Sequence, residues 1–222
     1  MPSYDSLKKK QAELIRKALD GSVFIGDAST EPLATLTVAT GTAPNQVIDL
    51  AALPVGWDDL GLLTEDGMAF SRDVSSSEVT SFGRVTPSRT DITADTTTLT
   101  VVAQETKLLT IGLATGADLA NIVPDATTGE LRIAKPVRPK SKHYRALSLA
   151  VDQTDEGEIF LGRFLPNAKV TSYAEQSYAG GEIPWGVTLT GEVDDELGYS
   201  EQWLFGGPGW LALLDKMGFP TA

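Results

Sequence analysis

The chain has 222 residues and no cysteine, and its 30 acidic and 18 basic residues give a net charge of −12. The lack of cysteine excludes disulfides, thiolate metal sites and cysteine nucleophiles, and the negative charge argues against nucleic-acid binding as a main role. No apolar run approaches the roughly 18 residues that a membrane-spanning helix needs, so we expect a soluble protein.

Residues 3–20 carry the pattern of an amphipathic helix, which Ser3 or Asp5 can cap and Gly21 can end. The apolar stripe comprises Leu7, Leu14, Ile15, Ala18 and Leu19. We therefore predict an N-terminal helical arm over residues 1–21, lying against its own domain or a neighbour. The segment lacks the apolar core of a secretory signal, which predicts a protein that is assembled in the cytoplasm where it is made.

From residue 22 onward, short β-branched runs alternate with Gly, Pro, Asn and Asp, which is the pattern of β-strands. The alternation of period two around residues 98–103 indicates a half-buried antiparallel sheet. Further strand patterns follow closely at residues 143–152 and 158–166. Separations this short indicate hairpins rather than parallel crossovers.

Two further helices are predicted in this β-rich region. The apolar spacing in residues 105–115 favours a short helix over a strand, and the pattern after Pro208 predicts a C-terminal helix over residues 208–218. We therefore predict a mainly β fold, an antiparallel β-sandwich or half-open barrel flanked by helices. It forms a single domain over residues 22–222.

Motifs of common catalytic sites are absent. His143 is the only histidine and lies in a strand pattern, and no GxSxG elbow supplies a nucleophile for it. HExxH, the P-loop and GxGxxG are also missing. Residues 152–158 imitate the start of a calcium loop, but its twelfth position is Arg163, so a hairpin turn is the better interpretation. The sequence predicts no catalytic residue, cofactor or metal.

Two alternative functions remain open on the residues alone. A monomeric glycan-binding or adhesion module would use exposed tryptophans as its groove, and a glycoside hydrolase would use a carboxylate pair such as Asp194 and Asp195. The four tryptophans are Trp57, Trp185, Trp203 and Trp210. Large aromatic residues more often anchor cores or interfaces, and adjacent acids on a strand point to opposite faces.

Three motifs follow one another along residues 57–219: W-x-x-L-G-x-L-T-x-D-G from Trp57, R-T-D-I-T-x-D-T-T-T-L from Arg89, and GGPGW…MGF near the C-terminus. The series resembles the major tail protein family of phages with long, non-contractile tails, especially phages of actinobacteria. The resemblance implies a β-sandwich-like tail tube subunit without catalytic residues. It also implies stacked rings, usually of six copies, around a tape-measure protein, bounded by tail terminator and tail-tip proteins and later traversed by DNA.

The implied role of DNA conduit fits the charge. A basic lumen would bind phosphates tightly, so a net charge of −12 suits a tube whose inner wall is acidic or neutral. Glu192 and Asp194, at alternating positions of a predicted strand, are the candidate lumen acids. DNA is then expected to pass through the virion tail without specific binding, and no membrane is involved.

Residues 71–95 are the candidate ring-stacking loop, because this polar segment carries Phe82 and three arginines, Arg72, Arg84 and Arg89. A ring that also stacks needs two different interfaces on each subunit. We expect this segment to reach the next ring.

A second candidate contact is a basic loop. Residues 132–145 hold six basic residues and no acid, whereas residues 146–222 hold twelve acids and three bases. The loop residues that we assign to an intersubunit contact are Lys135, Arg138, Lys140 and Lys142. Their expected partner is an acidic face of another copy.

Overall fold

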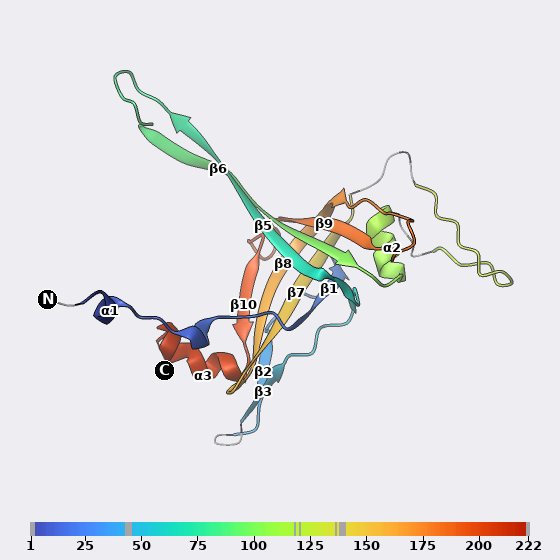
Figure 1. The fold of residues 1–222 in the computed structure, drawn as a ribbon. Helices are drawn as coiled ribbons and strands as arrows, with labels where there is room; N and C mark the ends of the chain where they lie inside the picture. Colours follow the sequence, from blue (N-terminus) through green and yellow to red (C-terminus); the bar gives the residue numbers. More distant parts are fainter. Residues whose placement is uncertain are drawn as a thin grey trace.

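The computed structural model describes residues 3–42, 46–117, 119, 121–135, 137 and 141–220. In this part of the chain, an eight-stranded antiparallel sheet with the order β4-β1-β7-β8-β9-β6-β5 forms the body, and β10 pairs with β8 (Figure 1). Its strands are β1 (Asp20–Asp27), β4 (Trp57–Asp59), β5 (Leu63–Val79), β6 (Arg89–Ala103), β7 (His143–Thr154), β8 (Gly157–Tyr173), β9 (Trp185–Glu192) and β10 (Gln202–Gly206). The predicted mainly β, antiparallel fold is confirmed.

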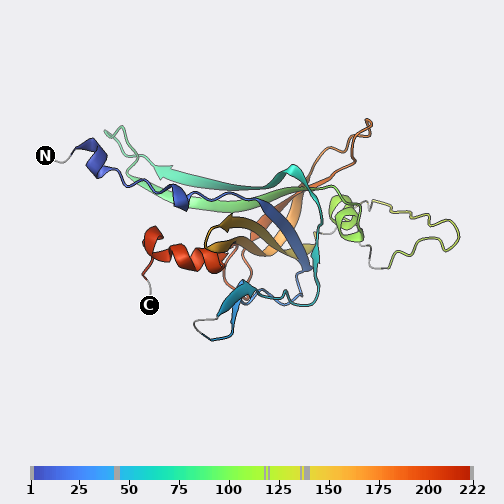
Figure 2. The same ribbon diagram turned by 60° about the horizontal axis from the view of Figure 1, so that its bottom comes forward.

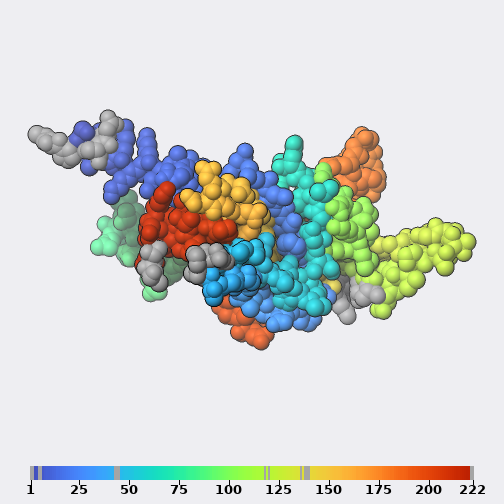
Figure 3. All heavy atoms as spheres, turned by 90° about the horizontal axis from the view of Figure 1, so that it is seen from below, coloured from blue at the N-terminus to red at the C-terminus, as the bar shows by residue number. Residues whose placement is uncertain are grey.

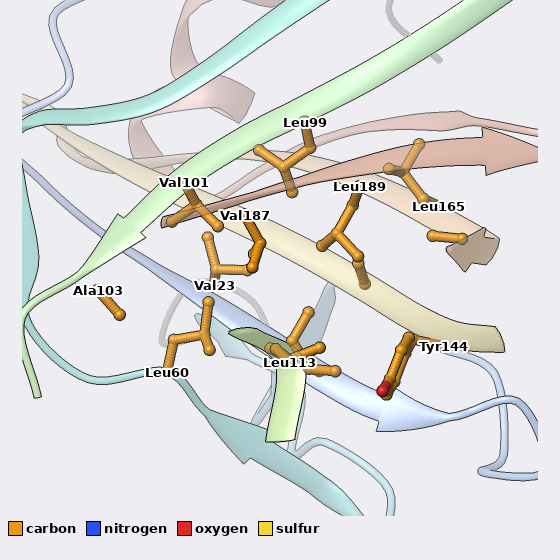
Figure 4. Packing of buried hydrophobic residues seen from close by; sticks show 13 residues of the cluster. Val23, Leu60, Leu99, Val101, Ala103, Leu113, Tyr144, Leu165, Val187 and Leu189 are labelled. Atoms are coloured by element: carbon orange, nitrogen blue, oxygen red, sulfur yellow. The ribbon is translucent and has the colours of Figure 1, made fainter. Parts of the chain in front are cut away.

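The period-two alternation places the main core on one face of this sheet. Leu99, Val101 and Ala103 of β6 are all buried, as the pattern predicts, and they lie with Val23 of β1 in one apolar cluster (Figure 4). Leu113 of the helix α2 (Leu108–Thr115) joins the cluster. The helix therefore covers apolar surface that the curved sheet leaves open.

The sheet curls until strands far apart in its order approach each other. A Cβ atom at Gly21 of β1 would lie 2.6 Å from Cε of Met68 in β5, and 2.8 Å from the carbonyl oxygen of Leu149. Since β1 and β5 are not neighbours in the sheet, this approach gives the body the shape of a half-open barrel.

A smaller apolar cluster lies on the other face of the sheet. It contains the buried residues Leu36, Leu149 and Phe160. Leu36 precedes a two-stranded hairpin made of β2 (Thr37–Thr40) and β3 (Val47–Leu50). Because apolar groups are buried on both faces of β7 and β8, these strands form the central layer of a sandwich-like body.

The continuous helix expected over residues 3–20 is not formed. Two short helical turns, α1 (Tyr4–Leu7) and η1 (Ala12–Leu14), are followed by extended chain. β1 begins at Asp20, inside the range predicted for the N-terminal helix. Leu7, Ile15 and Leu19 of the expected stripe are 66%, 76% and 56% exposed. An amphipathic helix this short is marginal unless an apolar surface covers its stripe. Of the stripe, only Leu14, in the turn η1 that contacts α3, is partly buried.

The other two predicted helices are present. α2 ends at Gly116, whose φ of 64° is left-handed. α3 (Pro208–Met217) begins with proline and ends before Gly218, whose φ is 86°.

Three segments project from the body. The β5–β6 ribbon and the loop of residues 121–135 extend from opposite ends in both ribbon views (Figures 1 and 2). The N-terminal segment leaves the body beside α3, and seen from below it extends away from the loop (Figure 3). The molecule therefore has two unlike ends, which is the geometry that head-to-tail assembly requires.

Candidate assembly interfaces

The candidate ring-stacking loop forms the outer half of the β5–β6 ribbon, which we call the arm (residues 71–95). Strand pairing continues along it from Ser71 opposite Thr98 to Val79 opposite Arg89. The side chains of residues 71–95 are exposed on both faces of the ribbon. A two-stranded ribbon with no buried face is marginally stable on its own.

The arm carries its own cross-strand ion pair. Arg72 Nε donates to Asp95 Oδ1 over 2.7 Å, and this bond, with the positive charge of Arg72, lowers the pKa of Asp95. The same interaction raises the pKa of Arg72. Arg72 therefore pairs within the shaft of the ribbon, away from its tip.

The tip of the arm holds the other predicted residues. Phe82 and Val85 are fully exposed there, with Arg84 between them. Arg89 starts β6 and donates through Nε to Asp91 Oδ2 over 2.6 Å. Phe82 and Arg84 thus lie together in the turn at the tip of the ribbon, whereas Arg72 and Arg89 form ion pairs in the ribbon behind them.

The candidate basic loop is described only in part. Lys135, the last residue of the loop segment 121–135, is exposed. Arg138 and Lys140 lie outside the described residues. Lys142 belongs to the body, where its Nζ lies 2.7 Å from Asp27 Oδ1 and 5.2 Å from the ring centroid of Tyr144.

The two candidate lumen acids are both engaged within the body. Glu192, at the end of β9, forms an ion pair with Lys169 and lies 3.8 Å from Nδ1 of His143. Asp194 lies in the turn after β9, where its Oδ1 accepts backbone N–H groups from Glu196 over 3.0 Å and Leu197 over 2.9 Å. Asp194 therefore closes this turn.

A network at the base of the arm has no counterpart among the sequence predictions. The Arg163 guanidinium lies between the rings of Phe70 and Trp203, 3.7 and 4.2 Å from their centroids. Its Nε donates to Glu201 over 2.5 Å, and the other carboxylate oxygen of Glu201 accepts the Thr97 hydroxyl over 2.9 Å. No sequence signal indicates it, because its members are distant in the chain.

The tryptophans serve separate parts of the body. Trp57 packs against Phe164 with ring centroids 6.0 Å apart, and Trp185 Nε1 donates to the Thr106 hydroxyl over 3.1 Å. At the other end, a series of ring contacts links Trp203, Phe205, Trp210 and Phe219. The four tryptophans do not line one common groove.

Comparison with known protein families decides the identity. A family model described as phage tail tube protein matches residues 9–190. The chain belongs to this family. As a phage tail tube protein it is a structural component of the virion tail. A search of curated protein sequences found no match.

The family match covers the strands from β1 into β9, including the whole arm. It therefore supports the family resemblance stated on the sequence motifs at residues 57–67 and 89–99. In the described part of this tail tube protein, no group of three or more His, Asp or Glu side chains is placed to hold a metal ion. No helix there is long and apolar enough to cross a bilayer.

Proposed function

We propose that the protein polymerises into stacked rings of six copies that form the hollow tail tube through which phage DNA passes. A tape-measure protein occupies the lumen during assembly, and terminator and tail-tip proteins bind the two ends. Family membership supports this proposal. The observation that carries it is the shape of the subunit, an exposed arm on one end of the body and a different surface on the other (Figure 2).

The exposed arm supports contact along the tube axis. Its tip presents Phe82 and Val85 fully to solvent, and large exposed apolar groups on a projecting ribbon are costly unless a partner covers them. We propose that each arm packs against a subunit of the next ring. The body then supplies the contacts within a ring, so that each subunit has the two interfaces that a stacked ring needs.

Charge supports passage of DNA without binding. The net charge of −12 repels the DNA phosphates, so few protein cations are left to displace the counterions of DNA and bind it. Glu192 and Asp194 stay proposed lumen residues, and the ion pair of Glu192 with Lys169 leaves that position close to neutral. The basic loop is proposed to contact an acidic face of a neighbouring subunit.

Electron microscopy of the purified protein tests the proposal. Concentrated protein is expected to form rings or tubes. The density of each repeating subunit is expected to match the size of one chain. Two-dimensional classes of the rings give the copy number directly. Dispersed monomers that bind a glycan would contradict the proposal and favour a monomeric binding module.

A further inference from the structure

The N-terminal segment, residues 3–11, is amphipathic and lies clear of the body. The side chains of Tyr4 and Leu7 are 76% and 66% exposed. Three consecutive lysines follow, of which Lys8 lies 4.1 Å from the ring centroid of Tyr4. The segment thus combines exposed apolar groups with a block of positive charge.

The root of this segment is fixed to its own chain. Leu19 N donates to the Val151 carbonyl over 2.9 Å, Arg16 pairs with Asp152 over 3.4 Å, and Glu13 lies 3.7 Å from Lys216 of α3. These contacts direct residues 3–11 along α3 and away from the body (Figures 1 and 3). Residues 3–11 therefore extend away from the body of their own subunit.

An apolar groove of about 850 Å³ opens at the mouth of the half-barrel, between β5 and the strands β1, β8 and β10. Its lining includes Leu62, Met68, Phe70, Leu161, Trp203 and Phe205. Leu62, Trp203 and Phe205 are 68%, 58% and 46% exposed. Aromatic groups exposed in a groove are the usual anchors of protein–protein contacts.

The rim of the groove is acidic. Asp20, Asp59, Glu65 and Asp66 line it with exposed side chains, and none of these carboxylates forms an ion pair with another described residue. The one lysine of the lining, Lys107, lies 2.8 Å from Glu105 and is neutralised by it. The other cation of the lining, Arg163, is paired with Glu201. The groove therefore combines apolar walls with an acidic rim, which complements the N-terminal segment.

We propose that the N-terminal segment of a second copy docks in this groove. Tyr4 and Leu7 then pack on the exposed side chains of Leu62 and Phe205, and the three lysines face the acidic rim. The groove supplies the apolar surface whose absence leaves residues 3–11 largely unwound, so the segment completes its helix on docking. This inference rests on the proposed self-assembly and names a contact separate from the arm.

Disulfide trapping tests the contact, because the chain has no cysteine of its own. Two single variants, Leu7→Cys and Leu62→Cys, are mixed, allowed to assemble and oxidised. A crosslinked dimer that needs both variants is expected. The matched control replaces Leu62→Cys by Val55→Cys, an apolar side chain that is 99% exposed and lies outside the groove lining. Equal crosslinking in this control would overturn the proposal.

The double variant carrying both Leu7→Cys and Leu62→Cys separates docking on a second copy from docking on the same chain. Crosslinked oligomers support the proposal, and a crosslink confined to the monomer overturns it. Tubes that form without any crosslink also overturn it, while leaving the tube function intact. Failure of the unmodified protein to form rings or tubes would instead contradict the proposed function.

Charge exchange gives an independent readout. Lys8→Glu, Lys9→Glu and Lys10→Glu together are expected to raise the concentration needed for assembly by at least about tenfold, since several charge pairs reverse sign. Adding Asp20→Lys, Glu65→Lys and Asp66→Lys to the same chain is expected to restore assembly. A loss that the second set of changes does not repair would overturn the proposed pairing.

Discussion

The guanidinium carbon of Arg163 lies 3.7 Å from the ring centroid of Phe70, so a cation of the central strand β8 is held against the first strand of the arm. The same guanidinium also lies 4.2 Å from the ring centroid of Trp203, and its Nε donates to Glu201. This arrangement joins β5, β8 and β10 at the point where the ribbon leaves the body. The arm is therefore anchored by polar and aromatic contacts at its base.

Replacing Arg163 with alanine is expected to destabilise the fold. The change leaves the Glu201 carboxylate, which is 11% exposed, without its cation. It also removes the contacts of the guanidinium with the rings of Phe70 and Trp203. Loss of one partner of a largely buried pair costs about 3–5 kcal/mol, measurable as a lower midpoint in urea. Arg72→Ala serves as control, because the Arg72 pair is exposed and should change stability much less. Equal effects of the two variants would show that Arg163 is not an anchor.

Deleting residues 75–90 is expected to leave a folded protein that cannot extend tubes. The deletion removes the tip and the exposed outer ribbon, whereas the core residues Leu99 and Val101 of β6 stay in place. Circular dichroism checks the fold, and electron microscopy checks tube length. Normal tube growth after this deletion would contradict a stacking role for the arm.

A milder variant of the same test is Phe82→Ala. Truncating a central apolar anchor of an interface costs about 2 kcal/mol or more, which corresponds to a critical concentration that is higher by at least about tenfold. The free subunit should keep its stability, because Phe82 is fully exposed. Assembly that matches the unmodified protein would place the stacking contact elsewhere on the arm.

The strand pattern was readable from the sequence because each face of the sheet repeats every two residues, as Leu99, Val101 and Ala103 show. The helices α2 and α3 were predictable because helical apolar spacing coincided with residues that begin or end helices, such as Pro208 at the start of α3 and Gly218 after it. The N-terminal pattern was misleading for a physical reason: amphipathic spacing does not say where the covering surface is. In the described structure most of the predicted stripe, including Leu7, Ile15 and Leu19, is exposed.

The sites were less predictable than the fold. Asp194 falls on an alternating position, yet the backbone turns before it and uses its carboxylate to bind Glu196 and Leu197 N–H groups. The Arg163 network joins residues from four parts of the chain. Periodicity describes one element at a time, so contacts that depend on how the sheet curls have no local signal.

Reversing charge at Lys135, Arg138 and Lys140 is expected to impair assembly without unfolding the subunit. Lys135 is exposed, so its replacement by glutamate should leave the core unchanged, while an acidic face on another copy would now repel the loop. Light scattering during assembly measures the effect. Raising the salt concentration should reduce the difference between variant and parent, since exposed charges are screened. Unimpaired tubes at ordinary salt would identify a merely solvated loop.

Acid is expected to weaken the shaft of the arm. The pKa of Asp95 is lowered by its hydrogen bond from Arg72 and by that residue's charge. A lowered pKa in the folded state means that the pair stabilises the fold above the ordinary aspartate value of about 3.9, and that this contribution is lost as the pH falls through the lowered value. Carboxyl chemical shifts of Asp95 report the titration. Arg72→Gln should return its pKa toward the ordinary value, and an unchanged titration would exclude the pair as the cause.

Replacing Gly21 with alanine tests the curl of the sheet. A Cβ atom there would lie 2.6 Å from Met68 Cε and 2.8 Å from the Leu149 carbonyl oxygen. The methionine end can move, but the carbonyl belongs to the strand that pairs with β1 and cannot. Overpacking of this kind costs about 1–3 kcal/mol, so Gly21→Ala should lower the urea midpoint and Met68→Ala should relieve it only in part. Gly181→Ala is the matched control, because no described atom lies within 4 Å of a Cβ at that position. If both glycine variants are equally stable, β1 and β5 do not approach each other as closely as the half-open barrel requires.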